Sequence, residues 1–311
     1  CRDWSSDVCS SDLGTDIERS GLPSPVIGSV LARLVRPDTT PVELEPDPTG
    51  RTYRLVVAPL ERGAASGRTI IVLADIMKQA RLDRVRRDFV ANASHELKTP
   101  VSGIRLLAQS VEAAASDGEV EQALMFARQI EAETERLQHL VSDLLDLSRL
   151  ESAPEPDAIA DLRVTVDRAV VSHRAAAARR GLDLSVDLSH VRGVDVYAAA
   201  DPTDIAIALD NLLDNAIAYT EQGSVTVTVR ATGDTVELQV SDTGTGIAAE
   251  HLSRIFERFY RVDRGRSRES GGTGLGLALV KHVVERSNGT VSVASDPGEG
   301  TTFTLRFPRA V

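Results

Sequence analysis

The stretch that decides the fold is residues 210–220, which read DNLLDNAIAYT. Asn211 and Asn215 stand four residues apart within it, so they lie on one face of a helix. The leucines, alanine and isoleucine beside them cover the opposite face. Upstream, Asp201 and Pro202 are typical of an N-cap and of the first helical position. We therefore predict a helix that starts there, buries one side and presents two neutral amides on the other.

Short alternating or apolar runs surround this helix and are typical of strands. A second helix is predicted over Gly274–Arg286, where apolar residues follow a glycine-rich start. Together these elements predict an α/β domain over residues 161–311, preceded by a linker at 153–160. The predicted strands are Leu182–Leu188, Val194–Ala199, Ser224–Ala231, Thr235–Ser241, Thr290–Ala294 and Thr301–Phe307.

Two glycine-containing motifs of this domain predict close approach of a ligand. SDTGTGI at 241–247 places the carboxylate of Asp242 at a strand end. There it can accept a hydrogen bond from an exocyclic amine, while Gly244 and Gly246 let the backbone approach the ring. The alternative is an ordinary tight turn, which uses the same residue types. GGTGLGLALVK at 271–281 precedes the second helix, and helix N-terminal N–H groups bind phosphate. It is not a P-loop, because Gly-Lys-Ser/Thr is absent.

A basic segment lies between the two motifs and reads RIFERFYRVDRGRSRESGG at 254–272. Its aromatic residues can anchor one end, while the Gly/Ser-rich remainder predicts a mobile lid over a phosphate site. The alternative is a solvated charged loop. Its arginines after the first are Arg258, Arg261, Arg264, Arg266 and Arg268.

The paired asparagines predict a second kind of ligand. The neutral amide oxygens of Asn211 and Asn215 suit a hydrated Mg²⁺ that also binds phosphates. The alternative is two solvent-facing amides.

Residues 78–152 predict two long amphipathic helices joined by a short turn, since Ser116–Gly118 interrupts the pattern. Such a hairpin leaves a broad apolar face uncovered, which a dimeric four-helix bundle buries. The first apolar stripe comprises Val85, Phe89, Ala93, Leu97, Ile104, Leu107 and Val111. The second comprises Ile130, Thr134, Leu137, Val141 and Leu144, widened by Leu140, Leu145 and Leu147.

The first of these helices carries His95 within SHELKTP at 94–100. His95 is two residues from Leu97 of the apolar stripe, about 200° round the helix, so we expect it on the solvent face. Glu96 can orient or deprotonate the imidazole, which activates a weak nucleophile. Thr99 follows one turn later, and Pro100 interrupts the helical hydrogen bonds beside it. The alternative is an ordinary surface histidine.

The N-terminal part is poor in helix. Two strands separated by ERGAASG are predicted at Thr52–Leu60 and Arg68–Ile76. CRDWSSDVCSSDL at 1–13 resembles translated adaptor sequence, and we expect it to be a non-native leader. The natural N-terminus, with any membrane helices, is then expected upstream.

Composition excludes several classes of function. Lys and Arg number 35 against 46 Asp and Glu, and the net charge of −11 argues against general nucleic-acid binding. The two cysteines, Cys1 and Cys9, exclude a disulfide scaffold and a cysteine-based zinc site. At 42% hydrophobic and 26% charged, the 311 residues are ordinary for a globular chain. No apolar run approaches the roughly 18 residues of a membrane span.

The order of these motifs resembles the sensor histidine kinases of bacterial two-component systems. SHELKTP is similar to their H box, DNLLDNA to the N box, SDTGTGI to the first glycine box, RIFERFY to the F box and GGTGLGLAL to the second glycine box. The resemblance covers about 86–309 and implies an α+β multidomain protein. A partial PAS-like β segment (14–77) would precede a dimerisation and histidine phosphotransfer hairpin (78–152), a four-helix bundle in the dimer. An α/β-sandwich GHKL ATP-binding domain (161–311) would follow.

The resemblance also implies the chemistry. A protein-histidine kinase of this kind autophosphorylates a histidine, here His95, with Mg-ATP and passes the phosphoryl group to an aspartate of a cognate response regulator. Glu96 would act as the base, and Thr99 would orient water for a phosphatase reaction on the regulator. Asn215 would bind Mg²⁺, and Asp242 would accept from the adenine amine. The residues implied at the nucleotide are Asn211, Asn215, Tyr219, Asp242, Gly244, Gly246, Arg258, Arg261, Gly272, Thr273, Gly274, Leu275 and Gly276.

Partners and location follow from the same resemblance. It implies a homodimer, a response regulator and no direct contact with nucleic acid. It also implies the cytoplasmic portion of a protein whose full-length form is attached to the cell membrane.

Two departures and two alternatives stand beside this interpretation. Ala218 occupies a position where family members often carry lysine, so one phosphate contact is missing, and Thr245 replaces a common apolar residue. Gyrase and MutL-type ATPases share the Asn and Asp-x-Gly-x-Gly elements but lack a helical HELKTP. A degenerate kinase acting as a dimeric scaffold is the other alternative, and the presence of all the motif residues argues against it.

Overall fold

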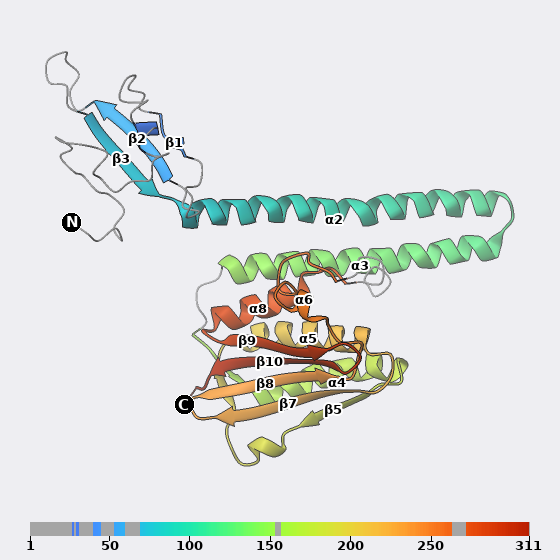
Figure 1. Ribbon diagram of the computed structural model, residues 1–311. Helices are drawn as coiled ribbons and strands as arrows, with labels where there is room; N and C mark the ends of the chain where they lie inside the picture. The colour runs from blue at the N-terminus through green and yellow to red at the C-terminus, as the bar shows by residue number, and fades with distance from the viewer. Residues whose placement is uncertain are drawn as a thin grey trace. The chain divides into compact units, whose positions relative to one another are not determined.

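The computed structural model describes residues 27, 29–30, 40–44, 53–59, 69–152, 157–262 and 272–310. The chain divides into two compact units, Cys1–Ala91 and Asn92–Val311. In the first unit, strands β1 (Val42–Glu43), β2 (Tyr53–Pro59) and β3 (Thr69–Asp75) form an antiparallel sheet in the order β1-β2-β3 (Figure 1). The predicted strand pair is confirmed as β2 and β3. The sequence does not predict β1, because two residues show no alternation.

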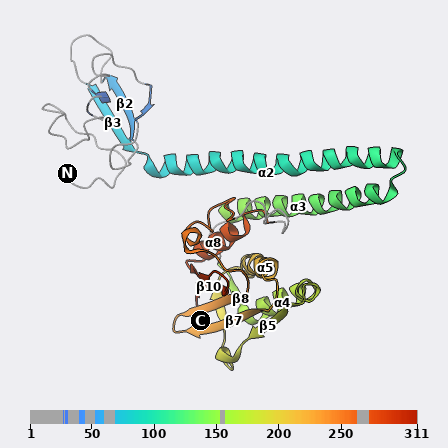
Figure 2. The ribbon, with the colours of Figure 1, turned by 45° about the vertical axis from the view of Figure 1, so that its right-hand side comes forward.

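Helices α2 (Met77–Ser116) and α3 (Val120–Ser152) form the predicted hairpin and lie side by side in both views (Figures 1 and 2). The turn between them contains Gly118 at φ 76°, a left-handed conformation that glycine adopts without strain. α2 continues through Pro100, whose side chain is buried. The predicted break at Ser116–Gly118 is therefore confirmed.

Burial in the hairpin agrees with the first predicted stripe, and the second stripe is buried in part. Phe89, Ala93, Leu97, Ile104, Leu107 and Val111 are half-buried along α2. On α3 the buried residues are Leu140, Leu147 and Leu150. Val141 and Leu145, placed by the sequence in the second stripe, are 41% and 66% exposed. Their exposure agrees with the uncovered apolar face that the sequence predicts for a single hairpin.

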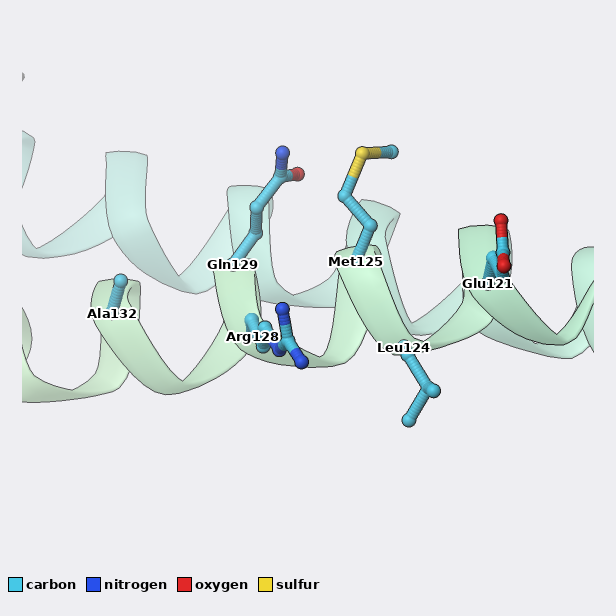
Figure 3. A pocket seen from close by; sticks show the side chains of 6 residues that line it. All are labelled: Glu121, Leu124, Met125, Arg128, Gln129 and Ala132. Atoms are coloured by element: carbon cyan, nitrogen blue, oxygen red, sulfur yellow. The ribbon is translucent and has the colours of Figure 1, made fainter.

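The exposed side of α3 carries further apolar residues. Leu124 and Met125 are 54% and 47% exposed. They line a shallow hollow with four neighbours, and Figure 3 shows Met125 and Gln129 projecting to the same side of the helix. A second hollow further along α3 is lined by Leu137, Val141 and Leu145 among others. We call these two hollows the outer face of α3.

The second unit continues as an α/β domain built on a five-stranded sheet in the order β5-β7-β8-β10-β9. β5 pairs with β7 in parallel, and the other pairs are antiparallel. The elements are β4 (Ile159–Asp161), α4 (Leu162–Arg179), β5 (Asp183–Asp187), η2 (Ser189–Val191), β6 (Tyr197–Ala199), α5 (Pro202–Tyr219), β7 (Ser224–Thr232), β8 (Thr235–Asp242), α6 (Ala249–Leu252), α8 (Gly276–Arg286), β9 (Thr290–Asp296) and β10 (Gly300–Pro308).

Helices α4, α5 and α8 lie on one face of this sheet, with α5 in contact with both others (Figures 1 and 2). The predicted N-cap of α5 is confirmed, since Asp201 accepts a hydrogen bond from the Thr203 N–H at 2.7 Å. α5 buries Ile205, Leu209, Leu212 and Leu213 completely or nearly so. Its opposite side, which carries the asparagines, is therefore left for the site.

Two parts of the domain differ from the sequence prediction. The 18-residue helix α4 is missing from it, because its alanine and valine run lacks a leucine stripe. Asp161 begins α4 by accepting a hydrogen bond from the Arg163 N–H at 2.9 Å. β6 is shorter than the predicted Val194–Ala199 and pairs with β4 rather than with the main sheet. β4 itself starts at Ile159, inside the segment predicted as linker.

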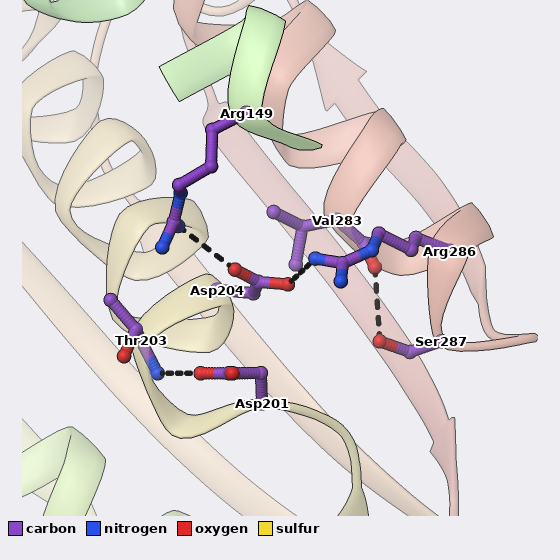
Figure 4. Close-up of polar contacts among 7 residues, drawn as sticks. All are labelled: Arg149, Asp201, Thr203, Asp204, Val283, Arg286 and Ser287. Carbon is purple, nitrogen blue, oxygen red and sulfur yellow. Dashed lines mark hydrogen bonds and ion pairs between the residues drawn. The ribbon is translucent and has the colours of Figure 1, made fainter. Parts of the chain in front are cut away.

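A buried carboxylate joins the end of α3 to the α/β domain. Asp204, in the first turn of α5, has a side chain only 2% exposed. Figure 4 shows it between two guanidinium groups: Arg149 of α3, whose nitrogen is 3.0 Å from Asp204 Oδ1, and Arg286 of α8, which contacts Oδ2. Burial raises the pKa of Asp204, while the charges of Arg286 and Arg149 act in the opposite direction. The pairing offsets the cost of burying this charge.

A histidine joins α4 to α5. The His173 Nδ1–H donates to the Ala169 carbonyl at 2.7 Å, and Nε2 lies 3.3 Å from Asp214 Oδ1. The hydrogen bond to Asp214 raises the pKa of His173, and the Ala169 bond and the charges of Asp214 and Asp210 add to this, while burial opposes it. The folded chain therefore binds the His173 proton more tightly than the unfolded chain does.

We predict a pH-dependent loss of stability in His173→Gln. Because the folded-state pKa lies above the unfolded value of about 6.5, the stabilisation is complete below that pH and is lost as pH rises through the folded pKa. The melting temperature of the variant should fall furthest below wild type at pH values below about 6.5, and the gap should narrow as the pH rises above that value. A gap for His173→Gln that widens with pH would contradict the assignment.

Candidate functional site

Asp242 is the last residue of β8, where the central strands of the sheet end. Its Oδ1 accepts hydrogen bonds from the N–H groups of Gly244 at 2.9 Å and Thr301 at 3.2 Å. Burial raises the pKa of Asp242, and the two backbone N–H groups act in the opposite direction. Its Oδ2 has no hydrogen-bond partner among the residues that the structure describes. One carboxylate oxygen is thus held by the backbone, and the other is available to a ligand.

The loop that follows Asp242 is fastened to α5 and to the β9–β10 turn. The Thr245 N–H donates to the Tyr219 carbonyl at 3.2 Å, and the Ile247 N–H donates to Ser295 Oγ at 2.8 Å. Gly246 has φ 68°, and a Cβ on it would lie 2.1 Å from the Asp296 carbonyl oxygen, so only glycine fits. The motif is therefore a tight turn whose hydrogen bonds hold it beside the free oxygen of Asp242.

The predicted asparagines lie half-buried on one side of α5. Asn211 Nδ2 donates to the Ile207 carbonyl at 2.8 Å, which directs Oδ1 toward the start of α8. A Cβ on Gly276 would lie 2.4 Å from that Oδ1. Asn215, one turn later, forms no side-chain hydrogen bond within the described residues. The helix and the glycine-rich loop therefore meet at Asn211, and the amide of Asn215 is free to bind a ligand.

The glycine-rich loop ends where α8 begins, at Gly276 rather than at the predicted Gly274. The Thr273 hydroxyl accepts from the Leu275 N–H at 3.2 Å and donates to Asp143 Oδ2 on α3 at 2.6 Å. Burial raises the pKa of Asp143, and the hydrogen bond from Thr273 opposes this. A residue predicted at the nucleotide is thus bonded to the helical hairpin.

The segment before the glycine-rich loop is tied to it through the backbone. The Phe259 N–H donates to the Gly274 carbonyl at 2.8 Å, and Phe259 has φ 61°, an unusual conformation for a non-glycine residue. Tyr260 contacts His251 Nδ1 at 2.8 Å through its hydroxyl, and the Arg254 guanidinium lies 4.3 Å from its ring centroid. These contacts hold the predicted F box as an ordered anchor.

The predicted lid arginines separate into two groups. Arg258 and Arg261 are half-buried, and Arg258 forms an ion pair with Glu151 at the end of α3. That Arg258 contacts the nucleotide stays a prediction. Arg264, Arg266 and Arg268, together with the predicted lid motion, fall outside the described residues.

His95 is exposed on α2, as the periodicity predicts. Glu96 beside it is half-buried, and Thr99 is exposed with its hydroxyl donating to the His95 carbonyl at 3.2 Å. The hydroxyl uses only its proton in this bond. Both lone pairs of Thr99 Oγ1 therefore remain available to accept a hydrogen bond from water. Within the described residues the His95 ring forms no hydrogen bond or ion pair, and none links it to the residues around Asp242.

Sequence reasoning missed three residues that complete these contacts. Thr301 holds Asp242 through its N–H, Ser295 bonds the loop and the Gly300 carbonyl, and Asp143 bonds Thr273. The Gly-Glu-Gly-Thr sequence at 298–301, a turn leading into a strand, was an available signal for Thr301. No sequence pattern indicates the role of Asp143, because its partner Thr273 is 130 residues away in the sequence.

Comparison with known families gives the same two-part organisation. Residues 85–153 match the His Kinase A (phospho-acceptor) domain, and residues 200–311 match the histidine kinase-, DNA gyrase B- and HSP90-like ATPase. The chain belongs to the sensor histidine kinases. The two matched domains contain His95 and Asp242 respectively, and neither extends over the segment predicted as PAS-like, which stays a prediction.

Individual relatives agree with this membership. The chain is 41% identical over 243 residues to the sensor-like histidine kinase SenX3 of Mycolicibacterium smegmatis, covering 77% of this chain and 62% of that protein. Full-length ShkA, solved with AMPPNP, is 28% identical with a TM-score of 0.52 over 72% of this chain and 46% of its own. The histidine kinase ThkA, solved in complex with the response regulator protein TrrA, has a TM-score of 0.59 at 18% identity over 91% of this chain and 83% of its own. The last likeness concerns the fold alone.

We predict that Gly276→Ala disrupts this histidine kinase site. The new Cβ would lie 2.4 Å from Asn211 Oδ1, so the amide must turn away and lose its bond to Ile207. Nucleotide affinity, measured by equilibrium binding of ADP with Mg²⁺, should fall about tenfold or more, as for a lost charged-group hydrogen bond.

Gly103→Ala provides the matched control, because nothing lies within 4 Å of its added Cβ in the middle of α2. That variant should bind ADP as wild type does and melt slightly higher, because alanine favours helix by about 1 kcal/mol over glycine. Wild-type affinity in Gly276→Ala would refute the close approach of Asn211 to the loop.

Proposed function

We propose that this chain is the kinase portion of a sensor histidine kinase, which phosphorylates His95 with ATP and passes the phosphoryl group to a response regulator. The observation that carries the proposal is an exposed histidine beside a carboxylate on a phospho-acceptor helix joined to an ATPase fold. The chain spans 62% of the length of the SenX3 relative, so the activity of the whole protein is part of this proposal.

ATP fits the residues at the end of β8. The free Oδ2 of Asp242 is an acceptor suited to the exocyclic amine of adenine. A Cβ on Gly244 would lie 2.5 Å from the Tyr219 carbonyl oxygen, so the turn after Asp242 packs against the end of α5 with no room for a side chain. Tyr219 is 40% exposed and offers a ring face for stacking. The glycine-rich loop ahead of α8 would receive the phosphates through Gly272, Gly274 and Gly276.

Mg²⁺ fits the amide side of α5 as an ion shared with the phosphates. Asn215 and Asn211 supply neutral oxygens, which Mg²⁺ accepts when phosphate oxygens and water complete its coordination. No group of three or more His, Cys, Asp or Glu side chains suited to a metal occurs in the described part of the chain. We infer that the ion is held mainly by the nucleotide, where it would neutralise phosphate charge.

The proposed reaction requires one phosphoryl transfer and one proton transfer. A ring nitrogen of His95 attacks the γ-phosphorus, a phosphorus–nitrogen bond forms, and the bond to the β–γ bridging oxygen breaks as ADP leaves. Glu96 accepts the imidazole proton. Positioning and charge neutralisation provide the remaining rate enhancement. Phosphoryl transfer requires the bound nucleotide to come within reach of His95 of the same protomer or of a second one.

A homodimer through the hairpin is supported by the outer face of α3. Leu124, Met125, Val141 and Leu145 are exposed there, and α2 adds Val101 at 55% and Leu106 at 65%. Burying these side chains against a second hairpin would form a four-helix bundle. The proposed dimerisation and phosphotransfer domain is residues 78–152, and the proposed ATP-binding domain is residues 161–311.

The response regulator, the phosphatase reaction and the membrane belong to the same proposal. Phospho-His95 would donate to an aspartate of the regulator, and the Thr99 hydroxyl would orient the water that removes it. The described helices include none with the length and apolarity of a membrane span. Attachment of the full-length protein to the cell membrane is inferred from the family.

We predict that His95→Gln abolishes autophosphorylation while ADP affinity is retained, because the acceptor lies outside the nucleotide site. Labelling with ATP followed by acid treatment measures the phospho-imidazole. His139→Gln is the control, since His139 is also exposed on a hairpin helix but has no adjacent carboxylate, and it should label as wild type does. Acid-labile label in His95→Gln would sink the assignment, and Mg-ATP hydrolysis without any labelling of wild type would favour a gyrase-type ATPase.

We predict that Glu96 and Thr99 serve opposite reactions. Glu96→Ala should slow autophosphorylation about 10²- to 10⁴-fold, as expected for a lost general base. Thr99→Ala should leave autophosphorylation within about threefold of wild type, since a hydroxyl has no useful basicity, and should selectively slow dephosphorylation of the regulator. Both rates are measured with the cognate regulator, and Thr99→Ser, which keeps the hydroxyl, is the control. Equal depression of both rates by both substitutions would mean that each residue merely supports the helix at Pro100.

A further inference from the structure

Thr220, immediately after α5, contains a buried hydroxyl with no partner. Its side chain is 0% exposed, and its Oγ1 forms no hydrogen bond with any residue that the structure describes. Its backbone is fixed as the C-cap of α5, where the N–H donates to the Ala216 carbonyl at 3.1 Å. A buried unpaired hydroxyl is destabilising, and in native proteins nearly all such groups have partners.

The position of this hydroxyl indicates what it serves. A Cβ on Gly244 would lie 3.0 Å from Thr220 Oγ1 and 2.8 Å from Asp242 Oδ1, so both side chains pack closely against the same glycine. The Tyr219 carbonyl lies against that glycine too, and it already accepts from the Thr245 N–H. Asp242 Oδ1 likewise holds two backbone N–H groups, leaving Oδ2 and the Thr220 hydroxyl as the groups without a partner there.

We propose that Thr220 is a nucleotide-specificity residue whose hydroxyl donates to the ring nitrogen beside the amine that Asp242 binds. This inference rests on the proposed ATP site. Adenine presents a donor, its exocyclic amine, next to a ring-nitrogen acceptor. The chain presents the complement, the Asp242 acceptor next to the Thr220 donor. Guanine carries a carbonyl oxygen where adenine has the amine, which would face Asp242 acceptor to acceptor. The pair thus recognises two adjacent atoms of the base.

The competing explanation is that Thr220 only stabilises the fold. The stability of the nucleotide-free protein distinguishes this explanation from a role in nucleotide binding. Thr220→Val keeps the shape and removes the hydroxyl, so a threonine without an internal partner loses nothing on substitution. We expect the nucleotide-free melting temperature of Thr220→Val to equal or exceed that of wild type. A lower melting temperature would overturn the proposal, because it would reveal an intramolecular bond that the hydroxyl makes.

Binding of ADP and two base analogues tests the contact itself. Thr220→Val should weaken ADP about three- to tenfold, the loss expected for one neutral hydrogen bond, while Thr220→Ser should stay near wild type. The ring nitrogens beside the amine are N1 and N7. One of 1-deaza-ADP and 7-deaza-ADP should therefore bind the Val variant and wild type equally, since that analogue already lacks the acceptor.

The outcomes separate this inference from the proposed function. Unchanged ADP affinity in Thr220→Val, or the same loss for ADP and both analogues, would overturn the role of Thr220 while leaving the ATP site in place. Failure of wild type to bind ADP, or undiminished ADP binding by Asp242→Asn, would overturn the site and this inference together. Wild type should also discriminate against GDP, and Thr220→Val should narrow that discrimination by the factor lost for ADP.

Discussion

The two hydrogen bonds to Asp242 Oδ1 are the constraint on which the proposed nucleotide site depends. They join the end of β8 to the glycine loop through Gly244 and to β10 through Thr301. A carboxylate buried beside apolar strands is costly, and the backbone N–H groups offset that cost without neutralising it. Because Oδ1 accepts both bonds, Oδ2 is left without a partner among the described residues.

Burial of one side of α5 determines where its two asparagines lie in the proposed site. Its leucine side is packed between sheet and helices, so its rotation is determined, and the opposite side necessarily presents Asn211 and Asn215. The Asn211 amide then meets Gly276 closely enough that no larger residue fits. Gly276 of the second glycine box is thus required by the Asn211 side chain of α5.

The ATPase domain and the helical hairpin share polar contacts that involve the same residues. Thr273 donates to Asp143, Arg258 pairs with Glu151, and Arg149 contacts the buried Asp204. Thr273 and Arg258 are also residues that the family resemblance places at the nucleotide.

The sequence by itself determined most helices and most strands, because amphipathic period, N-cap chemistry and glycine placement are local properties. The same local patterns single out His95, the two asparagines and Asp242 as candidate site residues. The sequence did not predict α4, whose alanine-rich run has no distinct apolar stripe. Only the tertiary structure decided that Thr273 meets Asp143, that Thr301 holds Asp242 and that the Thr220 hydroxyl is left unpaired. Those contacts join residues distant in sequence, and burial and hydrogen bonding at such positions depend on packing that no local pattern records.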